Sequence, residues 1–380
     1  MTFSPRRLAA VARKEFLHVV RDWRSLTLAL AIPVLLVWLF GYALTMDLNH
    51  VPTAVWDQSG TPQSRELISM LQGSAYFDIH RTPSSYRQIT AALDRREVMV
   101  AVVIPADFGR RLLAGQTAAV QAMVDGSDAN NANLAAGYLH ALAQIYNRKV
   151  LVQRLERRGI APADRMVTAE MRAWYNPDLR SVNVIVPGII ALVMAVIAAM
   201  LTSVTVAREW EMGTMEQLIS TPLRAAELVI GKVIPYFGVG LADVALAVIM
   251  GHFVFHVPIR GNAALLFAIA SVFLCGVLFF GMMLSIALKS QVLANQLALF
   301  ATYLPTLLLS GFVFSIHNMP PPIQVITYIV PARYFIAAMR GIFLKGIGLE
   351  ILWINVLLLL LYTALMVLLA HRKLRFKLEA

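Results

Sequence analysis

A charged segment between two long apolar runs is the feature that most constrains the fold of this chain. Residues 208–232 are rich in acids and bases, whereas the flanking runs 184–207 and 233–255 contain a single charged side chain, Asp243. Each run has about 20 residues or more, which suffices for a helix to cross a bilayer core of roughly 30 Å. The charged segment is therefore expected to lie at a membrane surface.

Composition and charge placement extend this prediction to the whole chain. Hydrophobic residues make up 58% and charged residues 14% of the sequence, against about 25% charged in soluble domains. The net charge of +11 does not indicate a nucleic-acid partner, because basic side chains cluster beside the apolar runs at both ends, six in residues 1–24 and four in 371–380. The positive-inside rule places both ends in the cytoplasm, so the number of spans is even.

Hydropathy predicts six transmembrane helices. Residues 1–24 form a cationic amphipathic helix at the inner interface, and residues 374–380 a cytoplasmic tail. Between the fifth and sixth spans, prolines and an apolar stretch too short to cross indicate an outer re-entrant segment, 319–346, which contains Pro331, Arg333 and Arg340. The predicted spans are 25–45, 183–206, 233–255, 263–288, 292–314 and 349–370.

Residues 46–180 have a different character from the rest of the chain. Strand-like runs at 51–56, 76–80, 99–104 and 119–124 alternate with helical runs at 63–72, 86–95, 106–114 and 131–158. Such alternation predicts an α/β domain, which lies outside the cytoplasm because it follows the first span. The fold class is thus a polytopic α-helical membrane protein with an α/β extracytoplasmic domain between spans one and two.

The charged segment contains signals for a short helix. Thr214 followed by Gln217 fits a capping box, and Gly213 allows a turn just before it. Met215, Leu218 and Ile219 then share one face, while Thr221 before Pro222 fits a second helix start. Such a helix outside the bilayer is either a docking element for another protein or a plain connector.

The segment and its surroundings resemble a known family. The run from Arg208, REWEMGTMEQLISTPL, ending in Gly231–Lys232, is similar to the cytoplasmic loop after the second span of ABC-2 type exporter permeases, and the chain from Lys14 onward resembles their drug-export branch with a large outer loop, the YbhS/YbhR-like subunits. This resemblance implies an ABC-2 type transmembrane domain over 181–373 and a coupling helix that contacts an ATPase. The implied contact residues are Arg208, Glu209, Glu211, Gly213, Thr214, Met215, Glu216, Leu218 and Pro222.

The sequence contains no nucleotide-binding motif. The pair Gly231–Lys232 is followed by Val233, and Ala226 stands where a Walker A motif needs its first glycine. We therefore expect no enzyme activity and no cofactor in this chain, with ATP and magnesium held by the partner ATPase. His252 and His256 have a spacing that zinc can use, but no third ligand follows, so no metal site is predicted.

Three polar residues within the spans are candidates for the transport pathway. Asp243 lies near the middle of the third span, where a carboxyl group is costly unless it faces protein or water; a packed, protonated acid is the equal alternative. Asn295 and Gln296 lie in the fifth span. Arg333 and Arg340 contact lipid headgroups, an anionic substrate or only solvent.

These features together predict a permease subunit of an ATP-driven exporter in a bacterial inner membrane, exporting a drug-like or amphipathic substrate. Six spans form half a pathway, so a second copy or a sister permease is expected, and the resemblance implies an ABC ATPase and a periplasmic adaptor protein as further partners. An ion-coupled secondary transporter and a non-transporting receptor are the alternatives. A secondary transporter requires more ionisable groups within its spans than this sequence has. A receptor does not require a broken outer segment.

Overall fold

A computed structural model describes residues 3–43, 50–157, 174–176 and 180–379 of the chain. It divides into two compact units, a helical unit formed by residues 1–45 with 172–380, and an α/β unit formed by residues 46–171. The two units are described separately below.

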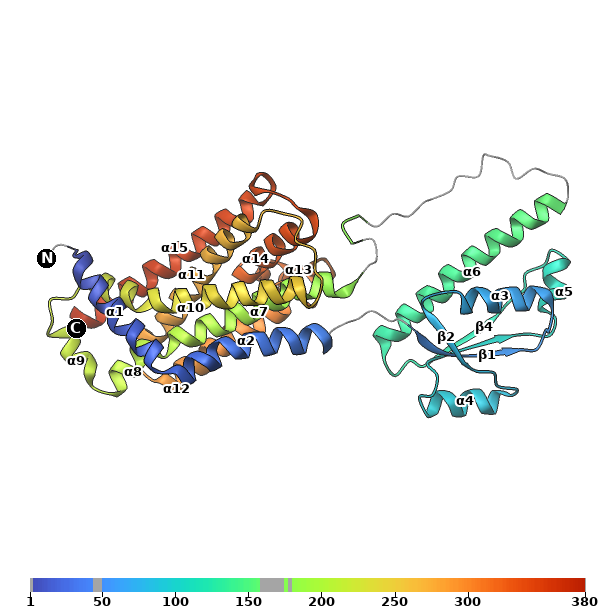
Figure 1. Cartoon of the computed structure of the whole chain (residues 1–380), viewed down its shortest axis with the longest axis horizontal. Helices are drawn as coiled ribbons and strands as arrows, with labels where there is room; N and C mark the ends of the chain where they lie inside the picture. The colour runs from blue at the N-terminus through green and yellow to red at the C-terminus, as the bar shows by residue number, and fades with distance from the viewer. Residues whose placement is uncertain (1–2, 44–49, 158–173, 177–179, 380) are drawn as a thin grey trace. The chain divides into compact units, whose positions relative to one another are not determined.

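The helical unit begins with two helices that run almost without a break, α1 (Pro5–Arg21) and α2 (Trp23–Ala43). Figure 1 shows that α1, α8, α9 and the end of α15 lie at one end of this unit, whereas α13 and α14 lie at the other. The remaining helices are α7 (Ser181–Ser203), α8 (Thr205–Glu211), α9 (Thr214–Ile219), α10 (Ala225–Phe253), α11 (Ala263–Leu288), α12 (Gln291–Leu309), α13 (Pro321–Thr327), α14 (Pro331–Arg340) and α15 (Leu349–Glu379), with short η1 (Ile316–Asn318) and η2 (Gly341–Lys345).

Six helical segments of the described residues are long and apolar enough to cross a membrane, in agreement with the predicted fold class. The bounds differ most from prediction in the third, fifth and sixth spans. The third span begins earlier, at Ala225, because the Glu227 carboxylate accepts the N–H of Arg224 and starts the helix there. The fifth ends at Leu309, before Gly311 takes a left-handed conformation with φ of +79°. The sixth continues as helix to Glu379, through the predicted tail.

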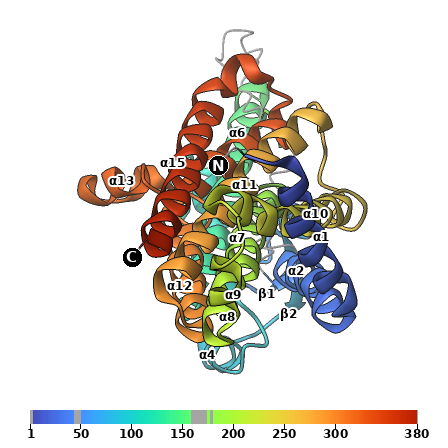
Figure 2. The same ribbon diagram turned by 90° about the vertical axis from the view of Figure 1, so that its left-hand side faces the viewer.

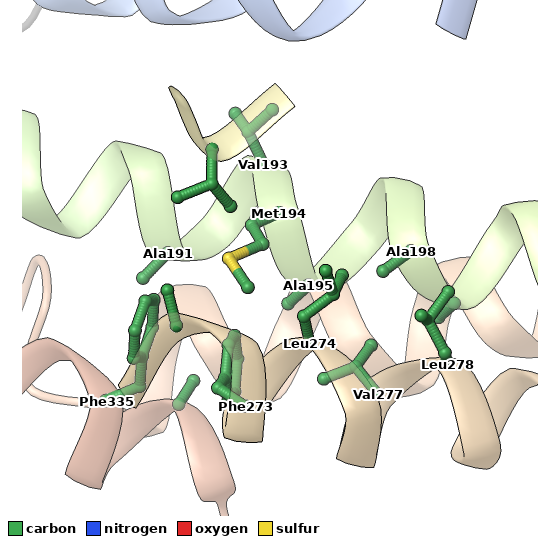
Figure 3. Packing of buried hydrophobic residues seen from close by; sticks show 14 of the residues in the cluster. Ala191, Val193, Met194, Ala195, Ala198, Phe273, Leu274, Val277, Leu278 and Phe335 are labelled. Atoms are coloured by element: carbon green, nitrogen blue, oxygen red, sulfur yellow. The ribbon is translucent and has the colours of Figure 1, made fainter. Parts of the chain in front are cut away.

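The core of the helical unit lies between α7 and α11. The side of α7 that meets α11 is lined by small residues, including Ala191, Ala195 and Ala198, against which Leu274 and Val277 pack (Figure 3). Small side chains let the two backbones approach closely, which is the usual basis of helix packing in membranes. In the end-on view, α7 lies among α10, α11 and α12 (Figure 2). This helix is accordingly the most buried of the six candidate spans.

The segment predicted to be re-entrant is a pair of helices, α13 and α14, bent by 83° at a short break. Prolines begin both helices, since a proline lacks the N–H that the first helical turn leaves unpaired. The ring of Phe335 on α14 stacks on Phe273 of α11 with centroids 4.3 Å apart. The pair is thus joined to the same core as α7, and it does not cross as a single straight helix.

The α/β unit is a four-stranded sheet of order β2-β1-β3-β4, with β1 parallel to β2 and β3 and with β4 antiparallel to β3. Alternate residues of its strands enter two cores: Val55 and Val102 face α3, α5 and α6, whereas Ala54 and Ala101 face α4 (Figure 1). The elements are β1 (Val51–Asp57), α3 (Pro62–Gln72), β2 (Phe77–Arg81), α4 (Tyr86–Asp94), β3 (Val100–Ile104), α5 (Phe108–Leu113), β4 (Gln121–Val124) and α6 (Ala129–Arg157).

Candidate coupling site

A helix break sets the geometry of the predicted coupling segment. The helical path of α7 is interrupted at Val204, and α8 starts at Thr205. After the break, the N–H groups of Val206 and Ala207 donate hydrogen bonds to the hydroxyl of Ser285 on α11, at 3.0 and 2.9 Å. Because buried backbone donors need partners, this one hydroxyl fixes the direction in which α8 leaves the core.

A buried ion cluster joins α8 to α1 and α10. The Lys232 ammonium group lies 2.6 Å from the Glu15 carboxylate and 3.0 Å from that of Glu209. Lys232 and Glu15 are only 2% and 5% exposed. Lys14 pairs with the same Glu209 oxygen at 3.0 Å but is more than half exposed. Two carboxylates share one buried ammonium group here. The ion cluster therefore links α1, α8 and α10 through charged groups that are shielded from solvent.

Glu209 also determines how α9 begins. The predicted capping box is absent, since Thr214 is the first residue of α9 rather than its cap and its hydroxyl donates to the Glu209 carboxylate. Gly213 occupies the cap position with φ of +70°, which gives the turn that the sequence predicted. The Thr214 hydroxyl therefore donates to a side chain five positions earlier and does not cap the helix that follows it.

A second group of hydrogen bonds connects α8 to the start of α12. The Glu211 carboxylate accepts the backbone N–H of Gln291 at 2.8 Å and its side-chain amide as well. The Arg208 guanidinium donates to the Gln291 side chain at 3.3 Å and lies 3.0 Å from the His18 ring of α1. The charges of α8 are thus used for contacts inside the helical unit.

The helix α9 has one buried face and one exposed face. Met215 is 1% exposed and belongs to the core, and Leu218 is half-buried against it. Glu216, Gln217 and Ile219 are exposed. This amphipathic arrangement leaves a small surface, Glu216–Gln217 with Ile219, available to another protein.

The second predicted helix start, Thr221–Pro222, is wrong. Both residues are exposed and precede α10, which starts three residues after Pro222. The reason is Glu227, which is fully buried and accepts hydrogen bonds from the Arg224 and Ser4 N–H groups and from the Arg7 guanidinium. The predicted loop 208–232 is accordingly shorter, because its last eight residues are helix.

Comparison with known proteins identifies the kind of chain to which this geometry belongs. A family model described as ABC-2 family transporter protein matches residues 23–372. This chain belongs to the ABC-2 transporter family. It is 38% identical over 357 residues to the probable multidrug ABC transporter permease YbhS of Escherichia coli, covering 93% of each chain. It is 31% identical to the probable multidrug ABC transporter permease YbhR of the same organism, covering 94% of this chain and 95% of that one.

A more distant relative of this ABC-2 permease is the inner membrane transport permease YhhJ of Escherichia coli, 25% identical over 90% of this chain and 89% of that one. The relatives named here are permeases rather than ATPase subunits, and membership of the family implies an ABC ATPase as partner. The family and the predicted resemblance to it are therefore confirmed.

Sequence reasoning missed Glu15, Lys232 and Glu227 as members of the site. One signal was available for Glu15: in the amphipathic helix of this permease it follows Val11 by four positions and Ala12 by three, so an acid lies on the apolar face. An acid on such a face needs a buried cation. Nothing in the sequence indicates which cation that is.

The three pathway candidates of the permease lie on two helices, Asp243 on α10 and the neighbours Asn295 and Gln296 on α12. Asp243 is buried on α10, and Asn295 is half-buried and accepts a long hydrogen bond, 3.5 Å, from Ser203 of α7. Gln296 is exposed on α12. They do not form one cluster.

The outer arginines of the permease make contacts within the chain. Arg340 donates to the main-chain carbonyl groups of Gly311, Phe312 and Val184 at 2.9, 3.1 and 3.3 Å. Arg333, two residues after the start of α14 at Pro331, donates to the Thr327 hydroxyl and lies 4.0 Å above the Tyr328 ring. Arg340 therefore joins the end of α12 to the start of α7.

The histidine pair predicted to be structural lies at the end of α10. The His252 ring is 3.1 Å from the carbonyl oxygen of Val257, and His256 is exposed.

Proposed function

We propose that this chain is one half of the transmembrane pathway of an ATP-driven exporter, with its power supplied by a separate ABC ATPase that binds the exposed face of α9. The observation that supports the proposal is that α9 has an exposed face and that its first residue, Thr214, is hydrogen-bonded to Glu209 of the buried ion cluster. A push on Glu216, Gln217 or Ile219 acts on α8, which Glu209 ties to α1 and α10. Motion of α9 is thereby passed to the helices that cross the membrane.

Orientation follows from the basic ends of the chain. The positive-inside rule places α1, α9 and the end of α15 on the cytoplasmic side, where ATP is available, in an inner membrane like that of the relative YhhJ. Six spans supply half a pathway, so a second copy or a sister permease completes it. The substrate is a drug-like or amphipathic molecule, in keeping with the names of the YbhS and YbhR relatives.

The test uses the chain together with the ATPase that co-purifies with it. Deletion of 214–220 is expected to abolish ATP-dependent uptake into inverted vesicles while the chain still inserts in the membrane. A matched control shortens the exposed loop of the α/β unit at Ser127, far along the chain from α9, and keeps uptake. Unchanged uptake by the inserted deletion variant, or transport by the purified chain alone in liposomes, would contradict the proposal.

We also propose that α6 of the α/β unit contacts a periplasmic adaptor protein. Ile145 and Leu151 on this helix are 57% and 43% exposed within the unit, and apolar side chains in such positions favour a protein partner. Photocrosslinkers placed at Ile145 and Leu151 are expected to capture one envelope protein in intact cells, whereas a crosslinker at the exposed Arg87 of α4 does not. Recovery of no partner from either α6 position would contradict this proposal.

A further inference from the structure

A buried carboxyl group in the middle of α10 has one oxygen atom without a hydrogen-bond partner in the part of the chain that the structure describes. Asp243 is 6% exposed, and its Oδ1 atom is fully buried and has no hydrogen-bond partner among the described residues. Removing a carboxyl group from water without a compensating contact is a large cost against the small net stability of a folded protein. Such a group persists in a helix of a transport protein when its function needs it.

The side chain lines a small cavity between α2, α7, α10 and α11. The cavity has a volume of about 10 Å³, which is space for no more than one water molecule. Its other walls are apolar, including Pro33 of α2, Ile190 and Ile197 of α7, and Leu274 of α11. The only charged group in the walls is therefore one carboxyl group.

A much larger groove begins beside this cavity. The groove holds about 490 Å³ and is bounded by α1, α2, α7, α8, α10 and α12. Its polar lining includes His18 of α1, Arg208 of α8 and Asn295 of α12, and the rest is mainly aliphatic. Ile197 lines both spaces. Along α10, the groove residues Tyr236 and Val239 are followed at helical spacing by Asp243, so the groove leads along one face of that helix to the carboxyl group.

We propose that Asp243 binds the cationic centre of an amphipathic substrate that comes through this groove. The proposal rests on the export function proposed above and names the substrate class. The aliphatic walls suit the apolar part of such a molecule, and a quaternary or protonated amine provides the charge that the buried carboxylate lacks. A buried charge is tolerated when it is paired, so a cation is favoured here over a neutral or anionic molecule of the same shape.

The helix α2, which lines both the groove and the cavity, is suited to move. Pro33 lies in the cavity wall and has no N–H to donate to the carbonyl of Ala29, a residue that lines the groove. The helix α2 is therefore weakened between the two spaces, and only 17% of its membrane-spanning window is buried. Bending at this point joins the cavity to the groove.

The test compares two probes of the same shape and opposite charge, tetraphenylphosphonium and tetraphenylborate. Their binding to the purified full chain is measured in nanodiscs of zwitterionic lipid, with empty nanodiscs subtracted. The wild-type chain is expected to prefer the cation. Asp243→Asn, which keeps the side-chain volume, is expected to weaken cation binding about tenfold or more, as loss of a charged partner does, and to leave binding of the anion unchanged or stronger. Asp243→Glu is expected to retain the preference for the cation.

A matched variant tests whether any carboxylate has this effect. Glu350→Gln removes an exposed carboxylate in the first turn of α15, away from the lining of both spaces, and is expected to change the affinity for the cation by less than about twofold, since exposed charges are screened. Equal cation affinity in wild type and Asp243→Asn, or a wild-type chain that binds neither probe, would overturn the inference. Because no transport is measured, these results stand apart from the vesicle experiment, whose failure would overturn the export function.

Discussion

The ammonium group of Lys232 lies 2.6 Å from a carboxylate oxygen of Glu15, although 217 positions separate the two residues in the sequence. Lys232 also pairs with Glu209, which in turn receives the hydroxyl of Thr214. One lysine thus connects the interfacial helix α1, the helix α8 and the first turn of α9. The arrangement joins the start of α9 to the membrane domain through a buried lysine, and the core side chain of Met215 adds an apolar contact.

The first prediction concerns this lysine. Lys232→Met is expected to lower the free energy of unfolding by about 3–5 kcal/mol, because Glu15 is then left buried without its cation and Glu209 keeps only the exposed Lys14. Thermal melting in mild detergent measures the loss. Lys14→Met is the matched control: it removes the other cation of Glu209, one that is 57% exposed, and is expected to cost about 1 kcal/mol or less. Equal losses in the two variants would show that the buried lysine has no special part.

The second prediction separates the two faces of α9. Glu216→Arg reverses a charge on the exposed face and is expected to weaken association with the ATPase about tenfold or more while the melting temperature stays the same. Met215→Ala removes a core side chain and is expected to lower stability by about 2–5 kcal/mol. Co-purification and melting are measured on both variants. A Glu216→Arg variant that melts early but binds the ATPase normally would contradict the assignment of the faces.

The sequence predicted the elements of the fold well because their signals are local. Apolar runs long enough to cross a bilayer gave six spans, prolines near Pro331 gave the broken outer segment, and alternating periodicities gave the α/β unit. Each of these features depends on residues within about 30 positions of one another. Their bounds differ from prediction where a distant group intervenes, as Glu227 does at the start of α10 by accepting hydrogen bonds from Ser4 and Arg7.

The candidate site was predicted only in part, for the same reason. The residues of the charged segment were named, but their roles depend on contacts across the fold. Thr214 was expected to cap its own helix and instead donates to Glu209, five positions earlier, which also pairs with Lys232 of α10. Arg340 was given three possible environments, and its actual acceptors are carbonyl groups from residues 28 to 156 positions away. No periodicity in a single sequence encodes such pairings.

The third prediction concerns the clamp formed by Arg340. Arg340→Met is expected to release the segment around Gly311 and Phe312 from α7, because each hydrogen bond from a charged donor contributes about 1.5–3 kcal/mol. Hydrogen exchange of the amides in 310–319 should increase by about tenfold or more. Arg340→Lys is expected to restore protection only in part, since one ammonium group does not reach three separated carbonyl groups as a guanidinium does.

The control for this clamp is Arg333, whose contacts are confined to α13 and α14. Arg333→Met is expected to raise exchange near Thr327 and to leave 310–319 unchanged. If both variants loosened 310–319 equally, the outer segment would be held by the general packing of α14 rather than by Arg340.

The fourth prediction concerns the contact that Arg340 keeps in place, between Gly188 on α7 and the ring of Phe312. A Cβ atom at Gly188 would lie 2.0 Å from the ring carbon Cδ2, far inside van der Waals contact, so Gly188→Ala is expected to cost about 1–3 kcal/mol. Phe312→Ala opens this space at a cost of its own, and the double variant is expected to be more stable than the sum of the two losses predicts. Gly281→Ala provides the comparison, because its Cβ would lie 2.3 Å from the main-chain oxygen of Ala199. Phe312→Ala should give no relief there, and similar relief for both glycines would mean that the ring does not close against α7.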